Sequence, residues 1–232
     1  MKTVGLLGGM SWESSLLYYK AINEGVRAKL GGLHSAKIVM VSVDFEEIEI
    51  LQHKGEWEKL GEMLAKEALK IERAGAECLL ICTNTMHKVA PWVESAIKIP
   101  LIHIADATAK ALIKDGVKKV GLLGTAFTME QDFYKSRLQE HGLEVVVPNK
   151  QKRELVHSVI YNELCLGECK AVSKEAYLEI IEKLTKEGAE GVILGCTEIG
   201  MLVKQSDTKV KLYDTTTIHA QSAVEFACSA KE

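Results

Sequence analysis

One cysteine, Cys196, stands where a thiol could act as an acid or a base. It ends the apolar part of the segment GAEGVILGCTE (residues 188–198), whose run at 192–194 has the length and content of a buried parallel strand. Gly195 lets the backbone turn, so Cys196 is expected at the carboxyl end of that strand. Ligands of open α/β sheets bind at this end, and a thiolate there could take a proton from a bound molecule.

The same segment occurs once earlier, with a hydroxyl in place of the thiol. Residues 75–85, GAECLLICTNT, align with residues 188–198 and set Thr83 on Cys196. A second repeat, VGLLG, begins at Val4 and again at Val120. Two repeats in the same order and at nearly the same spacing indicate two similar halves, because the period is far too long for a solenoid.

Apolar runs alternate with amphipathic stretches along the chain, a pattern typical of parallel sheets covered on both faces. Helices are predicted over residues 57–73 and 129–141, and residues 52–54 are expected as a polar segment before the first of them. Ser11 or Ser14 is expected to cap the first helix of the chain. The predicted strands are 3–7, 37–43, 78–82, 101–104, 119–123, 143–147, 192–194 and 210–213. The two α/β domains are assigned to residues 1–105 with 215–232, and to residues 106–214.

Two related halves that face each other would bring two sets of strand ends to one interface. Thr83, Asn84 and Thr85 would come from one half, and Cys196, Thr197 and Glu198 from the other. Short hydroxyl and amide side chains suit a small carboxylate ligand, and acid–base groups on two sides of one carbon could invert a stereocentre. Structural alternatives stay open, with Cys196 as a core thiol, Thr83 as a turn hydroxyl, and Asn84 and Thr85 as caps of a following helix.

Composition and charge narrow the class of protein. The chain has 232 residues, 47% hydrophobic and 26% charged, which suits a globular protein of one or two domains. The net charge is −3 and Lys and Arg do not cluster, so no nucleic-acid partner is expected. Apolar runs stay well below the ~18 residues of a membrane span, and no signal peptide is recognised. The scattered cysteines favour reduced thiols in the cytoplasm, and Cys165 and Cys169 lack the further ligands of a metal site.

Three motifs carry a resemblance to a known family. They are GLLGGM from Gly5, NTxH from Asn84, and LGCTEI from Leu194. The sequence resembles the aspartate/glutamate racemase family, within the wider Asp/Glu/hydantoin racemase group. The resemblance implies an α/β fold of two pseudo-symmetric, doubly wound parallel-sheet domains with the active site in the interdomain cleft. It also implies racemisation without pyridoxal phosphate, with two cysteines as acid and base, and assembly as a homodimer.

The sequence departs from the family pattern at the first of these two cysteines. Thr83 stands in its place, and Cys82 comes one residue too early. Neighbouring side chains on an extended backbone point to opposite sides, so Cys82 is expected to face away from the site. The chain resembles most the branch of the family with threonine at this position. The family's basic substrate-binding pair is not evident. By position, Gln52 and residues 165–167 stand closest to it.

The resemblance and the residues together predict a cofactor-independent amino-acid racemase that acts on L-aspartate or L-glutamate. Cys196 is the expected principal acid and base, and Thr83 a relay or hydrogen-bond donor. The expected substrate-binding residues are Met10, Gln52, Asn84, Thr85, Thr125 and Thr197. Three alternatives remain: a racemase of broad specificity, a single-cysteine decarboxylase of the same superfamily, and an amino-acid-binding protein without catalysis.

Overall fold

The computed structural model describes residues 1–230 and divides the chain into two compact units. Unit 1 comprises Met1–Ile104 together with the chain from His219 onward, and unit 2 comprises Ala105–Ile218. Each unit is built on one parallel sheet flanked by helices, so the predicted α/β class with two parallel sheets is confirmed. Within the described residues, no helix has both the length and the hydropathy to cross a membrane.

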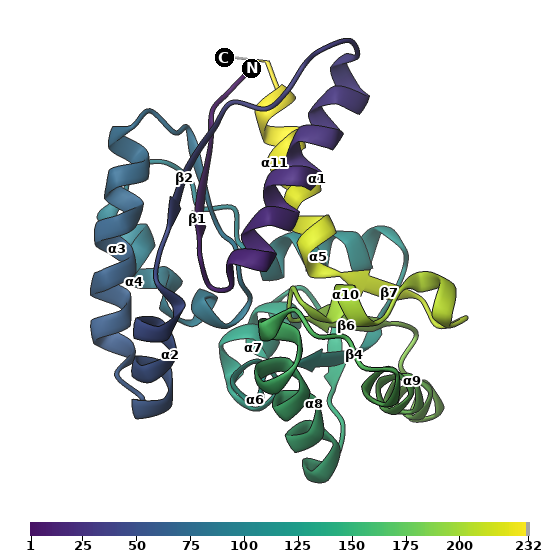
Figure 1. Cartoon of the computed structure of the whole chain (residues 1–232). Helices are drawn as coiled ribbons and strands as arrows, with labels where there is room; N and C mark the ends of the chain where they lie inside the picture. The colour runs from purple at the N-terminus through teal and green to yellow at the C-terminus, as the bar shows by residue number, and fades with distance from the viewer. Residues whose placement is uncertain (231–232) are drawn as a thin grey trace. The chain divides into compact units, whose positions relative to one another are not determined.

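The sheet of unit 1 has the strand order β2-β1-β3, formed by Ile38–Ser42, Val4–Gly8 and Cys78–Ile81. Side chains of a strand alternate between its two faces, and both faces of β1 are covered. Leu7 packs into the cluster formed with helix α3 (Trp57–Arg73), whereas Leu6 packs into the cluster formed with α1 (Trp12–Leu30) and α11 (Thr215–Cys228). Figure 1 shows α3 and α4 (Ala90–Ala96) on one side of β1, and α1 with α11 on the other.

The sheet of unit 2 has the order β5-β4-β6-β7, formed by Glu144–Val146, Lys119–Gly124, Val192–Gly195 and Leu212–Asp214. Leu123 and Leu194 share a buried cluster with α8 (Lys150–Asn162) and α9 (Ala171–Lys186), which lie together in Figure 1. The remaining helices of this unit are α5 (Ile104–Lys114), α6 (Ala126–Glu130), α7 (Asp132–Glu140) and α10 (Ile199–Leu202), with short 3₁₀ turns at Leu164–Leu166 and Gln205–Asp207.

The two sheets repeat not only their strands but also their register. In unit 1, Gly5 pairs with Leu79 and Leu7 with Ile81. In unit 2, the corresponding Gly121 pairs with Val192 and Leu123 with Leu194. A strand that slipped by one residue would send all its side chains to the opposite face, so a shared register means a shared core layout. The duplication read from the sequence is therefore present in the backbone pairing.

The segment before α3 differs from its prediction. Residues 52–54 end a helix, α2 (Phe45–Lys54), rather than forming an irregular polar segment. Asp44 starts this helix by accepting a hydrogen bond from the Glu46 N–H at 3.1 Å, and Gly55, at φ 72°, ends it. Caps at both ends thus define this short helix of ten residues.

Two further elements also differ from the sequence prediction. The predicted strand at 101–104 is reduced to a single parallel bridge between Leu79 and Leu101, because α5 already begins at Ile104. The predicted helix at 129–141 is two helices, since the backbone of Gln131 is extended (φ −84°, ψ 157°) between α6 and α7.

Candidate active site

Cys196 lies directly after β6, at the carboxyl end of the sheet of unit 2. Its side chain is 8% exposed and belongs to the apolar cluster that contains Leu194 and Tyr177. Burial, and then the negative charge of Glu198, raise the pKa of the Cys196 thiol well above its usual value. The thiol is therefore protonated at neutral pH.

Glu198, which the sequence analysis placed at the same strand end as Cys196 and Thr197 without a role, contacts this thiol. Its side chain is 3% exposed, and its Oε2 accepts hydrogen bonds from the Cys196 thiol at 2.9 Å and from the Thr197 hydroxyl at 2.8 Å. The predicted pair of Cys196 and Thr197 thus meets at one carboxylate oxygen. The only sequence signal for this contact is the adjacency of the three residues, which does not tell where their side chains point.

Thr83 occupies the matching position in unit 1. It follows β3 and Cys82, and its side chain is 9% exposed. Cys82 is completely buried in the cluster that contains Tyr18 and Ala223, and burial raises the pKa of its thiol. The prediction that Cys82 faces into the domain is confirmed, so the available nucleophilic group at the end of β3 is the Thr83 hydroxyl.

The backbone of Thr83 is held by a buried histidine. His87 donates from Nδ1 to the Thr83 carbonyl at 2.8 Å, and its Nε2 accepts from the Ile104 N–H at 3.2 Å. A carbonyl can only accept and an amide N–H can only donate, so this arrangement requires the neutral imidazole with the proton on Nδ1. His87 therefore positions the end of β3 as a neutral side chain.

A second histidine supports the first. The ring of His219 lies 5.8 Å from that of His87, centroid to centroid, and is fully buried. Its Nε2 donates to the Ile102 carbonyl at 2.6 Å, while its Nδ1 accepts from the Tyr18 hydroxyl at 2.8 Å. Burial lowers the pKa of His219 from 6.5 to about 4, so this ring is also neutral at pH 7. Both rings are thus held by hydrogen bonds to backbone groups and to the Tyr18 hydroxyl.

The glycine loop after β1 is closed by its own serines. Ser11 caps α1 by accepting from the Ser14 N–H at 3.3 Å, which confirms one of the two predicted caps. The Gly9 N–H donates to the Ser15 hydroxyl at 2.8 Å, so it already has an internal partner and is not directed at a ligand. Met10, a predicted site residue, is 3% exposed and packs in the apolar cluster with Leu7.

Three other predicted substrate-binding residues of unit 1 are buried polar side chains. Asn84 and Thr85 are 2% and 5% exposed at the start of the 3₁₀ turn Thr85–Val89. The Asn84 side chain makes no capping hydrogen bond to this turn, which weakens the reading of Asn84 as a cap. Gln52 is 3% exposed on α2, and its amide donates to the Met86 sulfur at 2.9 Å.

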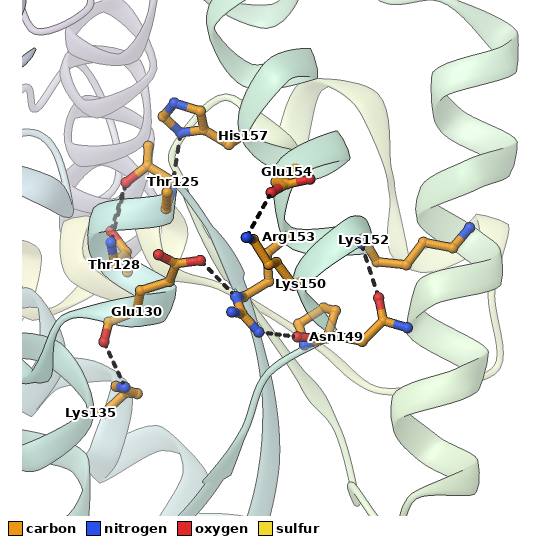
Figure 2. A network of polar contacts seen from close by, with 12 residues as sticks. Thr125, Thr128, Glu130, Lys135, Asn149, Lys150, Lys152, Arg153, Glu154 and His157 are labelled. Carbon is orange, nitrogen blue, oxygen red and sulfur yellow. Dashed lines mark hydrogen bonds and ion pairs between the residues drawn. The ribbon is translucent and has the colours of Figure 1, made fainter.

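Thr125 caps α6 at the carboxyl end of β4. Its hydroxyl accepts from the Thr128 N–H at 3.3 Å and lies 3.2 Å from the Thr128 hydroxyl. Figure 2 marks the contact between these two residues. His157 of α8 reaches the same turn and accepts at Nδ1 from the Ala126 N–H at 3.1 Å. The sequence analysis did not select His157, because a histidine on an amphipathic helix carries no signal of the turn that it contacts.

The position of the family's basic pair holds no basic side chain. In residues 165–167, Cys165 is partly buried, Leu166 is 68% exposed and Gly167 ends a turn at φ 76°. In the described part of the chain, no three His, Cys, Asp or Glu side chains gather as a metal site would require. The residues that can do chemistry at the strand ends are thus a thiol, hydroxyls, amides and one buried carboxylate.

Comparisons with known proteins agree with this arrangement. A family described as Asp/Glu/Hydantoin racemase matches residues 7–223. A crystal structure of a candidate Asp/Glu racemase from Yersinia pestis is 52% identical, with a TM-score of 0.92, and the match covers 99% of this chain and 100% of that one. An aspartate racemase homologue from Pyrococcus horikoshii is 40% identical, with a TM-score of 0.86 and coverage of 99% and 100%.

A relative of known specificity is more distant. The broad-specificity amino-acid racemase RacX of Bacillus subtilis is 24% identical over 159 residues, which cover 68% of this chain and 67% of RacX.

Proposed function

Because the chain belongs to the Asp/Glu/hydantoin racemase family, we propose that it is a cofactor-independent amino-acid racemase that acts on aspartate or glutamate. The observation that carries the proposal is the equivalence of Cys196 and Thr83. Each follows the strand that pairs with the VGLLG strand of its own unit, in the same register. The names of the similar proteins support the reaction class and the acidic substrates.

In the proposed reaction, Cys196 acts on the α-hydrogen of the L-enantiomer. The thiolate takes the proton from Cα, the electron pair of the C–H bond stays on carbon, and the thiol is formed again. Because an amino-acid α-hydrogen is very weakly acidic, the carbanion must be stabilised by hydrogen-bond donors in a site that excludes water. Asn84 and Thr85 are the donors that we assign to the substrate carboxylates, since both are almost fully buried directly after β3. Thr197 is assigned to the wall of the site, because its hydroxyl already donates to Glu198 at 2.8 Å.

Inversion needs a proton from the opposite face of the same carbon. The proposal requires the substrate to reach both strand ends, so that Thr83, or a water molecule that it binds, delivers this proton. A hydroxyl loses its proton far less readily than a thiol, whose usual pKa is about 8.5. Thr83 can relay a proton but is a poor base, so the D-enantiomer should lose its α-hydrogen much more slowly than the L-enantiomer.

The remaining predicted residues have supporting roles in this proposal. Thr125, whose oxygen caps α6, and Gln52, whose amide donates to the Met86 sulfur, are further polar groups that we assign to substrate binding. Met10 contributes an apolar wall that helps to exclude water. Whether the site also accepts other side chains, as the name of RacX suggests for that protein, is a question of specificity within the same mechanism.

The threonine at position 83 also favours a second candidate, chemistry on a single face of Cα. A decarboxylase of this kind would lose CO₂ from one side and receive a proton from Cys196. Racemisation leaves the carbon count unchanged, so the release of CO₂ separates the two reactions. Binding of an amino acid with neither proton exchange nor CO₂ release would identify a binding protein.

The experiment compares the wild type with Thr83→Cys on both enantiomers of aspartate and glutamate. Chiral chromatography should detect slow formation of the D-form from the L-form by the wild type. The variant should convert the D-form faster, because the strand ends of both units then carry a thiol. An unchanged or lower rate on the D-form, in a variant that remains folded, would argue against the role that we assign to Thr83.

A further inference from the structure

One residue, His87, holds the turn that follows β3 at several points. Its Nδ1 donates to the Thr83 carbonyl at 2.8 Å, and its backbone N–H donates to the Asn84 carbonyl at 3.1 Å. Its Nε2 accepts from the Ile104 N–H at 3.2 Å. The Thr83 N–H is also bonded, because it donates to the Ile81 carbonyl at 2.9 Å. The peptide groups on both sides of Thr83 are therefore fixed, and with them the direction in which its side chain leaves the strand.

The ring of His87 is fixed as well. The rings of His103 and His219 lie 4.4 Å and 5.8 Å from it, centroid to centroid, and all three side chains are almost fully buried. The Thr83 carbonyl needs a donor and the Ile104 N–H needs an acceptor. One imidazole satisfies both only when it is neutral with its proton on Nδ1. The tautomer of His87 is therefore part of what positions Thr83.

The strand end of unit 2 is built without such a histidine. Continuing the alignment of the two repeats by two residues sets His87 on Gly200. The matching turn in unit 2 is closed by backbone bonds such as the one from the Ile199 N–H to the Cys196 carbonyl at 3.0 Å. This turn can thus form without a histidine ring. The half that has the ring is the half in which Thr83 replaces a thiol, so the role of His87 is tied to Thr83 rather than to the fold.

We propose that His87 is a positioning residue that decides the stereochemical outcome of the reaction. This inference rests on the proposed function. Cys196 takes the α-hydrogen of the L-enantiomer from unit 2, whereas Thr83 and all the partners of His87 named above belong to unit 1. His87 therefore acts on the second step, the delivery of a proton to the opposite face of Cα.

In that step the hydroxyl of Thr83, or the water that it binds, gives a proton to the carbanion. The electron pair on Cα forms the new C–H bond, the D-form results, and solvent restores the proton of the donor. When Thr83 is displaced, the carbanion recovers its proton from the Cys196 thiol instead and the L-form is returned. Loss of the hold on Thr83 should therefore stop inversion while exchange of the α-hydrogen continues.

Two amide variants separate the two bonds of the ring. The amide of asparagine can occupy the position of Nδ1, so His87→Asn keeps a donor for the Thr83 carbonyl and loses the acceptor of the Ile104 N–H. The amide of glutamine reaches the position of Nε2, so His87→Gln keeps that acceptor and loses the donor to Thr83. Both variants keep the backbone bond to Asn84. The difference between them therefore reports the bond to Thr83.

The test measures two rates on L-aspartate. NMR in heavy water follows the exchange of the α-hydrogen, and chiral chromatography follows the formation of D-aspartate. His87→Gln should lower the formation of D-aspartate by about 10- to 100-fold but keep exchange within about twofold of the wild type. His87→Asn should keep both rates close to those of the wild type. His34→Gln, at an exposed histidine of the same unit, is the control and should change neither rate.

A role in stability alone would give a different pattern. In that case His87→Gln would lose exchange and inversion in the same proportion, and this result would overturn the proposal. A loss of D-aspartate formation in His87→Asn as large as that in His87→Gln would overturn it too, because the bond to Thr83 would then not matter.

A second readout uses the wild type and does not depend on turnover or on the folding of a variant. Heteronuclear NMR of protein with isotope-labelled histidine rings identifies which nitrogen carries the proton. The ring of His87 should carry it on Nδ1. A proton on Nε2, or on both nitrogens, at neutral pH would overturn the proposal whatever the activity. A proton on Nδ1 in a protein that exchanges no α-hydrogen would contradict the racemase function but uphold the hold of His87 on Thr83.

Discussion

The free energy of unfolding should depend on pH through His219, the buried histidine whose ring lies beside that of His87 next to the Thr83 loop. His219 is fully buried, donates to the Ile102 carbonyl and accepts from the Tyr18 hydroxyl. A second proton on the ring would remove the acceptor that Tyr18 uses and would leave a charge in the core. Burial therefore lowers the pKa of His219 to about 4 from 6.5 in the unfolded chain.

The direction and size of the effect follow from this difference. Between pH 6.5 and 4 the unfolded chain binds a proton that the folded protein does not. The stabilisation by neutral His219 is thus complete above about pH 6.5 and is lost as the pH falls toward 4. The difference between the two pKa values corresponds to about 3 kcal/mol of unfolding free energy.

Urea unfolding at several pH values between 7 and 4 measures this loss. His219→Gln keeps an amide donor and acceptor but does not titrate, so the wild type should lose about 3 kcal/mol more than this variant over the range. His34→Gln, at an exposed histidine, should behave like the wild type. Equal losses in the wild type and His219→Gln would refute the assignment of the neutral ring and its two hydrogen bonds.

Two further substitutions test the strand ends of unit 1. Gly9→Ala should lower the unfolding free energy by about 2–4 kcal/mol, because Gly9 has φ 93° and a Cβ would lie 2.2 Å from the Val43 oxygen. Gly55→Ala is the control, since Gly55 has φ 72° but a Cβ there would meet no atom within 4 Å. In the same urea assay this control should lose only about 1 kcal/mol of unfolding free energy. Cys82→Ala should lose about 1–2 kcal/mol from the core yet retain α-hydrogen exchange, whereas a folded but inactive Cys82→Ala would mean that Cys82 takes part in the chemistry.

Much of the fold could be read from the sequence because its signals are local and periodic. The amphipathic pattern predicted α3 at Trp57–Arg73 to the residue, and the repeats predicted two sheets whose registers agree. The helix α2 was missed because it is only ten residues long and its start depends on the Asp44 cap. The strand expected at 101–104 failed because a short apolar run fits either a strand or the start of a helix, here α5.

The site was predictable in its residue types but not in its contacts. Strand ends and the repeat select Cys196 and Thr83 as candidates, and the alternation of side chains along a strand correctly predicted that Cys82 packs in the core. The partners of these residues depend on side-chain directions that no spacing encodes. The Glu198 carboxylate on the Cys196 thiol and the His87 ring on the Thr83 carbonyl are contacts of this kind.

The most direct test of the central claim is the exchange of the α-hydrogen in heavy water, measured by NMR for both enantiomers of aspartate and glutamate. The account predicts that the wild type exchanges the L-forms readily and the D-forms slowly, and that Cys196→Ala, while folded, exchanges neither. Exchange of the L-forms by Cys196→Ala at the wild-type rate would contradict the claim that Cys196 is the acid and base of this protein.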